Sequence, residues 1–83
     1  LGSEEVSESE LSMFPNPASS YVNVHSNAQI EHLQLYDVQG RTVLERSPMS
    51  ATARLDLVGM PAGVYFLTIS SRDAKTQLRL IVQ

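Results

Sequence analysis

Short stretches of alternating apolar and polar residues follow one another along residues 11–83, and residues typical of turns separate them. No stretch keeps the period of 3.6 residues that a buried helix face requires. About seven such stretches, spaced roughly 8–12 residues apart, are typical of an antiparallel β-sandwich. The pattern therefore predicts an all-β fold of about seven antiparallel strands in two sheets. The expected strands are Leu11–Phe14, Tyr21–His25, Ile30–Tyr36, Arg41–Arg46, Arg54–Leu57, Val64–Ser70 and Lys75–Val82.

The alternation divides each expected strand into an inward and an outward face, because successive side chains of a strand point to opposite sides of its sheet. In the segment Arg41–Arg46 either Val43 or Leu44 faces inward, and we assign Val43 to the core. The predicted core is Val22, Val24, Leu33, Leu35, Val43, Leu55, Leu57, Tyr65, Leu67, Ile69, Leu78 and Leu80.

Four side chains fall out of phase with this core and are expected on the outer surface: Tyr36, Phe66, Arg79 and Ile81. Exposed apolar groups on a small domain are typical of contact surfaces. These residues form the candidate recognition surface, for a receptor or for a second copy of the domain. The alternative is that a neighbouring loop covers the aromatic side chains.

Proline, glycine and asparagine mark the predicted turns. Each proline of Pro15-Asn16-Pro17 moves the residue before it out of the helical region, which predicts a tight turn through Asn16–Ser19. Ser26–Ala28 is a second expected turn, and Ser47–Ser50 is an expected loop. Asp37–Gly40 predicts a hairpin in which Gly40 takes a positive φ.

The corner before the expected strand Val64–Ser70 carries a recognisable motif. Its pattern, Leu57-x-x-Met60-Pro61-x-Gly63-x-Tyr65, resembles the tyrosine corner of immunoglobulin-like sandwiches. In that motif the tyrosine hydroxyl bonds back to the preceding corner. The alternative is that Tyr65 is a core aromatic residue without such a bond. The resemblance makes an immunoglobulin-like sandwich the expected fold.

Charge and composition exclude several function classes. The chain has 83 residues, no cysteine, and nine acidic against six basic residues. Four of the acids lie in residues 1–10, which leaves five acids against six bases in residues 11–83. A net charge this close to zero over residues 11–83 is untypical of a nucleic-acid binder or a polybasic membrane anchor. The longest apolar run, Val64–Leu67, is too short to span a bilayer, and no signal peptide begins the chain.

The N-terminal residues are expected to lie outside the folded body. Leu1–Ser3 is typical of the remnant of a removed affinity tag, and the alternative is native linker. Residues 4–10, EEVSESE, are acidic and serine-rich, which predicts a flexible linker. Residues 11–83 then form one domain, and a linker before it suggests a C-terminal module of a larger parent.

No catalytic or metal-binding pattern is visible. His25 and His32 are expected on outward faces of different strands, where solvent-facing roles are more common than metal ligation. Asp37, Asp56 and Asp73 each lie at or beside a turn, where aspartate commonly bonds its own backbone. No serine lies in the sequence motif of a nucleophile elbow, and the glycines do not have the spacing of a phosphate-binding loop. We expect no enzyme activity, no cofactor, no metal and no small-molecule substrate.

Four blocks, in order, resemble one known family. They are Phe14-Pro15-Asn16-Pro17-Ala18, the segment from Leu35 to Val43, the segment from Leu55 to Leu67, and Leu78–Val82. Together they resemble the type A C-terminal sorting domain of the type IX secretion system of Bacteroidota. The resemblance covers about Leu11–Gln83, and the chain departs from the family in ending with glutamine where many members have lysine.

The resemblance implies an export signal that directs its parent protein through an outer-membrane translocon to the cell surface. Family members pass through the periplasm, and in many a sortase-like peptidase cleaves the linker ahead of the domain. The implied partners are the translocon, shuttle and sortase components of the secretion system. The sorting-motif residues that the resemblance implies are Pro15, Asn16, Pro17, Asp37, Gly40, Arg41, Gly63, Tyr65, Leu78, Leu80 and Val82.

The C-terminal segment bears on how such a signal is recognised. Leu78, Leu80 and Val82 keep one phase to the end of the chain, which predicts a strand rather than a linear tag. At a sheet edge this strand would accept another strand, from a receptor or from a second copy in a homodimer. The rival interpretation is an immunoglobulin-like spacer or binding module of a secreted multidomain protein.

Overall fold

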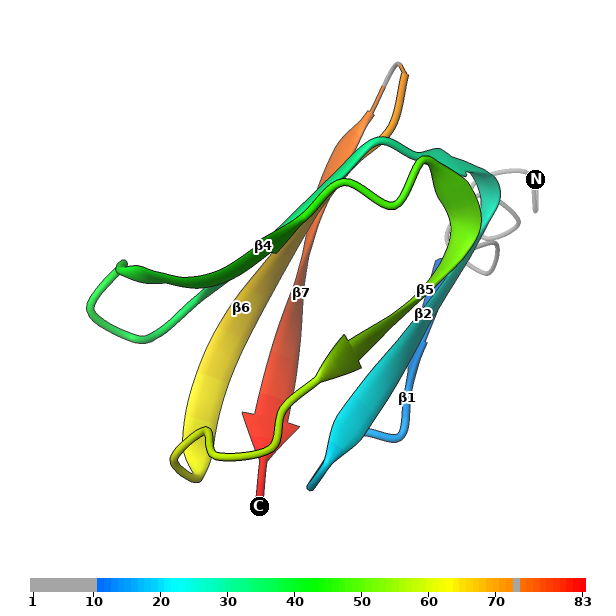
Figure 1. The fold of residues 1–83 in the computed structure, drawn as a ribbon. Coiled ribbons are helices and arrows are strands. Elements are labelled where there is room, and N and C mark those ends of the chain that lie inside the picture. Colours follow the sequence, from blue (N-terminus) through cyan, green and yellow to red (C-terminus); the bar gives the residue numbers. More distant parts are fainter. Residues whose placement is uncertain (1–10, 73) are drawn as a thin grey trace, which may run out of the picture.

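The computed structural model describes residues 11–72 and 74–83, and these residues form seven strands in two sheets (Figure 1). The three-stranded sheet has the order β1-β2-β5 and the four-stranded sheet the order β4-β3-β6-β7, and neighbouring strands in both sheets run antiparallel. This confirms the predicted two-sheet β-sandwich. The strands are β1 (Leu11–Phe14), β2 (Tyr21–Ile30), β3 (His32–Tyr36), β4 (Thr42–Arg46), β5 (Ser50–Asp56), β6 (Gly63–Ser70) and β7 (Lys75–Val82).

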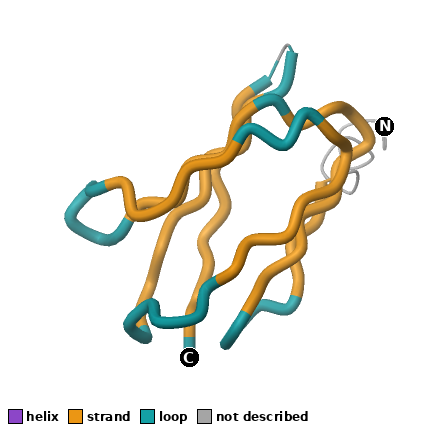
Figure 2. Tube along the Cα trace, viewed as in Figure 1, coloured by secondary structure: helices purple, strands orange, loops and turns teal. Residues whose placement is uncertain are grey.

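The connections lie mostly at the two ends of the sandwich, as Figure 2 shows. The turn that joins β3 to β4 projects beyond the sheets, at the left of Figure 1. None of the described residues forms a helix that is long and apolar enough to cross a membrane. The predictions for residues 1–10 and for Asp73 fall outside the described residues.

The core fills the space between the two sheets, as the alternating pattern predicts. Ten of the twelve predicted core residues are buried, and Leu78 is partly buried against them. Burial of this kind stabilises the fold by roughly 25 cal/mol for each Å² of apolar surface removed from water. The buried residues are Ala18, Val22, Val24, Ile30, Leu33, Leu35, Leu55, Leu57, Tyr65, Leu67, Ile69, Leu80 and Val82.

The assignment of Val43 to the core is wrong. Its side chain is 43% exposed, whereas Leu44 packs against the core. The reason is an irregularity in the pairing of β3 with β4, where the register passes from Leu35–Leu44 to Tyr36–Thr42. Val43 is the extra residue, and a bulge of this kind reverses the side to which the following residues point.

The predicted turn at Ser26–Ala28 is also wrong, because β2 continues through it to Ile30. The pairing of β2 with β5 becomes irregular between His25 and Ile30, and the Ser26 hydroxyl accepts a bond from the Ala28 N–H at 3.1 Å. The chain then changes sheets at Glu31, whose N–H donates to the carbonyl of Ser70 at 2.8 Å. Polar residues with a high turn propensity therefore lie in an irregular strand, because a neighbouring strand pairs with both of its ends.

Candidate recognition site

Residues Pro15–Ala18, here called the strap, are bonded to the free edge of β7 through Asn16 and Ala18. The Ala18 N–H donates to the carbonyl of Ile81 at 2.8 Å, and the Gln83 N–H donates to the carbonyl of Ala18 at 2.7 Å. Ala18 and Val82 thus form a parallel bridge, although they belong to segments connected to different sheets. The strap therefore joins the two sheets at this end of the sandwich.

The side chain of Asn16 extends this pairing by one step. Its Oδ1 accepts a bond from the Ile81 N–H and its Nδ2 donates to the carbonyl of Arg79, both at 3.1 Å. An amide side chain carries one acceptor and one donor group, the same pair that a backbone peptide presents to a neighbouring strand. Asn16 therefore takes the place of a strand residue at a point where the flanking prolines have no N–H to donate.

This arrangement changes the expectation that β7 offers an open edge. The Arg79 carbonyl, the N–H and carbonyl of Ile81, and the Gln83 N–H are bonded to the strap. Strand addition to the C-terminal half of β7 is therefore blocked by the chain itself, which is one of the ways in which proteins protect sheet edges. Among the described residues, the bonds of the strap reach no further along β7 than the Arg79 carbonyl.

The inward residues of β7 complete this part of the predicted motif. Leu80 and Val82 are buried, and Leu78 packs against the core. On the neighbouring strand, Tyr65 lies opposite Leu80 and Gly63 lies opposite Val82. The structure thus places Gly63 and Tyr65 beside the apolar residues of β7, and Asn16 bonds the backbone of the same strand.

The tyrosine corner is confirmed. The Tyr65 hydroxyl donates to the carbonyl of Pro61 at 2.6 Å, and the corner itself is closed by a bond from the Met60 N–H to the carbonyl of Leu57 at 3.0 Å. The ring is 6% exposed, so the hydroxyl fixes the corner while the ring fills the core.

Asp37, Gly40 and Arg41 form a separate group in the hairpin between β3 and β4. The Asp37 Oδ1 accepts bonds from the N–H groups of Gln39 and Arg41 at 2.9 and 3.0 Å, and its Oδ2 accepts from Arg41 Nε at 2.9 Å. The Arg41 N–H is the main cause that lowers the pKa of Asp37, and the Arg41 side chain and the Gln39 N–H add to it. Gly40 has a φ of 86°, as predicted for this hairpin.

The four candidate surface residues lie together on the outer side of the four-stranded sheet. Tyr36, Phe66 and Arg79 occupy adjacent positions on β3, β6 and β7, and Ile81 lies opposite Val64 in the next row. The Tyr36 hydroxyl donates to Gln34 Oε1 at 2.7 Å. Tyr36, Phe66 and Ile81 are partly buried, and Arg79 is exposed. We call this surface the outer face.

A groove of about 390 Å³ lies on the outer face, under the projecting hairpin. Tyr36, Phe66 and Thr68 line it from β3 and β6, and the hairpin adds Asp37, Val38 and Gly40. Val38 is 70% exposed and was not singled out from the sequence. Turn residues carry no periodic signal, so the sequence pattern could not place Val38 beside the aromatic pair.

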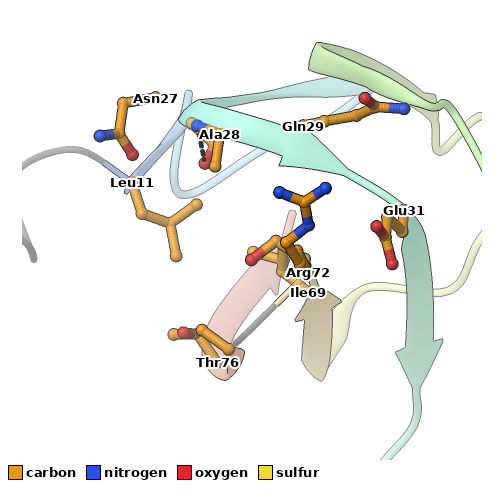
Figure 3. Close-up of a pocket in the computed structure, with 11 residues that line it drawn as sticks. Leu11, Asn27, Ala28, Gln29, Glu31, Ile69, Arg72 and Thr76 are labelled. Carbon is orange, nitrogen blue, oxygen red and sulfur yellow. Dashed lines mark hydrogen bonds between the residues drawn. The ribbon is translucent and has the colours of Figure 1, made fainter.

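A larger cavity of about 580 Å³ opens at the end of the sandwich where β1 begins. Figure 3 shows Leu11 and Asn27 on one side of it, Glu31 on the other, and Arg72 between them. Its lining mixes apolar and polar side chains, and the described residues place no group of three metal-ligating side chains there or elsewhere.

Comparison with protein families gives a match over residues 12–83 to the model described as "Secretion system C-terminal sorting domain". The chain belongs to this family. The sorting domain is the C-terminal signal of the type IX secretion system, so the parent protein is exported by that system to the cell surface. The resemblance found in the sequence blocks is thereby confirmed.

Among solved structures, the sorting domain resembles PorZ, a bacterial surface component of the type IX secretion system of Porphyromonas gingivalis. The TM-score is 0.75 at 15% sequence identity, and the match covers 98% of this chain but 12% of that one. At this identity the likeness concerns the fold alone. A comparison with curated proteins gives no match.

Proposed function

We propose that the secretion system recognises this sorting domain as a folded shape, through side chains of the outer face. The observation that carries the proposal is the strap on β7. Because the strap bonds the backbone of Arg79, Ile81 and Gln83, the last residues of the chain are part of the sandwich and are not offered as an extended tag.

Side chains of the outer face are among those that remain accessible on this part of the fold. Arg79 and Ile81 alternate with the inward residues of β7, and Phe66 lies beside Arg79 on β6. We propose that these residues, with Tyr36, contact components of the type IX system: the translocon, the shuttle and the sortase. The domain acts by binding and not as an enzyme.

Three finer steps belong to the same proposal. The parent crosses the periplasm before it reaches the translocon, and a sortase-like peptidase cleaves the chain in or ahead of residues 4–10. A homodimer through an edge strand would use the Lys75 end of β7, since the strap occupies the other end.

The test is a reporter fused to the N-terminus of the full chain and expressed, with an N-terminal export signal, in a strain that has a type IX system. Surface reporter is measured on intact cells and divided by total reporter. We expect surface delivery from the full chain and loss of delivery when Leu78–Gln83 is removed, because the truncation deletes Leu80 and Val82 from the core.

Amide hydrogen exchange on the purified truncated chain distinguishes the two modes of recognition. We expect the truncated chain to lose protection throughout the sandwich. A truncated chain that keeps full protection and still fails to reach the surface would mean that the tail is read as a linear element. A full-length fusion that stays inside the cell would instead favour the spacer interpretation.

A further inference from the structure

The outer face carries basic side chains without acidic partners among the described residues, and this charge indicates what kind of partner the face binds. The inference drawn from it rests on the proposed role of this face in recognition. Lys75 and Gln77 line the groove from β7, and Arg79 lies next to Phe66 at the end of the aromatic row. Among the described residues, neither Lys75 nor Arg79 has a carboxylate partner within ion-pair distance.

The acidic groups of the same face are engaged elsewhere. Asp37 accepts three bonds from its own hairpin, including the one from Arg41 Nε. Glu45, which lies opposite Gln34 on the edge strand β4, has its Oε2 2.8 Å from His32 Nε2. Neither carboxylate is paired with a cation of β7, so Lys75 in the groove lining and Arg79 beside Phe66 are positive charges without an acidic partner among the described residues.

The floor of the groove is apolar and aromatic. Tyr36 and Phe66 are cross-strand partners, and Val38 extends from the hairpin beside them. An apolar floor bordered by cations is complementary to a ligand that combines an apolar side chain with a negative charge. A purely ionic ligand such as a phosphate would leave the aromatic floor unused.

Backbone pairing does not compete with this mode of binding at the C-terminal half of β7, because the strap already occupies that edge. A partner that approaches there must be recognised by side chains. We infer that the partner of the groove is a protein segment that places an apolar side chain on Tyr36 and Phe66 and acidic side chains against Lys75 and Arg79.

The test uses the reporter fusion with two double variants of equal charge change. Lys75→Glu with Arg79→Glu alters the groove, and Arg46→Glu with Arg54→Glu alters exposed arginines on β4 and β5. We expect the groove variant to lower surface delivery about tenfold or more, and the control variant to stay within about twofold of the unmodified chain. Thermal unfolding of each purified chain establishes that the variants remain folded.

Two milder variants keep the test informative if the charge reversal unfolds the domain. Lys75→Gln with Arg79→Gln removes the charges without repulsion. Phe66→Thr removes one of the two aromatic rings of the floor while it keeps a residue suited to a strand. Both are expected to lower surface delivery severalfold, since a charged and an apolar contact each contribute to such an interface.

The outcomes separate the inference from the proposed function. If surface delivery of the groove variants equals that of the control variant, the inference is overturned and the proposed function stands. Equal loss in the groove and control variants would overturn it too, because the system would then respond to total charge. Loss in the charge variants but not in Phe66→Thr would identify a polyanion such as a phosphorylated glycan instead of a protein segment. If the unmodified fusion stays inside the cell, the proposed function fails and the inference fails with it.

Discussion

Asn16 is bonded to the backbone of Ile81, 65 positions further along the chain, with Oδ1 accepting from the Ile81 N–H at 3.1 Å. The same side chain donates to the carbonyl of Arg79. One residue of the Pro-Asn-Pro motif thus connects the start of the domain to its last strand. The motif that looks like a local turn in the sequence serves a long-range contact in the fold.

Replacement of Asn16 tests this contact. Asn16→Ala leaves the Ile81 N–H and the Arg79 carbonyl without their partner, and we expect a loss of about 1–2 kcal/mol in the free energy of unfolding. Amide exchange at Ile81 should become faster than in the unmodified chain. Asn27→Ala, another exposed asparagine, is the control and should change stability by less than about 0.5 kcal/mol. Equal changes in stability for Asn16→Ala and Asn27→Ala would contradict a stabilising role of the Asn16 bonds to β7.

The tyrosine corner is tested by Tyr65→Phe, which removes the hydroxyl that donates to the carbonyl of Pro61 and keeps the buried ring. We expect a cost of about 1 kcal/mol, measured by chemical denaturation. Tyr36→Phe is the matched control, because the Tyr36 hydroxyl bonds the Gln34 side chain of the same strand on the outer face. A larger loss in Tyr36→Phe would show that the corner bond is not a principal constraint.

The bulge in β4 predicts a contrast between two apolar residues. Leu35→Ala should cost roughly 2–5 kcal/mol because Leu35 is fully buried between the sheets. Val43→Ala should cost less than about 0.5 kcal/mol, since Val43 is the exposed extra residue of the bulge. Denaturant midpoints of the two variants measure the difference. A large loss in the free energy of unfolding for Val43→Ala would show that Val43 belongs to the core after all.

Gly40 tests backbone strain alone. A Cβ at this position meets no atom within 4 Å, yet the φ of 86° is one that side chains rarely adopt. Gly40→Val should therefore destabilise the domain by about 1–2 kcal/mol through strain. Gly40→Asn should cost less, because asparagine tolerates this region of φ better than valine. Thermal melts that coincide for the two variants would argue against strain as the cause.

The hairpin carboxylate predicts a dependence on pH. Since the pKa of Asp37 is lowered in the fold from an ordinary value of 3.8, its contribution to stability is present above that value. The contribution is lost as the pH falls through the lowered pKa, because protonation weakens the bonds from Arg41 and Gln39. Unfolding of Asp37→Asn should show a smaller loss of stability on acidification than the unmodified chain does. A steeper acid dependence in the variant would contradict the assignment.

The alternation of apolar and polar residues by itself determined the fold class, most strands and nearly all of the core. Leu33 and Leu35, for example, share one face of a strand, and a strand with one apolar face must bury it. The motif Met60-Pro61-x-Gly63-x-Tyr65 likewise predicted the corner, because its geometry depends on residues close together in the sequence.

Tertiary structure decided what depends on pairing between distant segments. The register of β3 with β4 turned Val43 outward, and the pairing of β2 with β5 carried a strand through Ser26–Ala28. The bonds from Asn16 to β7 join residues more than 60 positions apart, and no local pattern specifies a partner at that distance. Side-chain period is a local property, whereas register and edge protection are set by which strands meet, and only the folded chain contains that information.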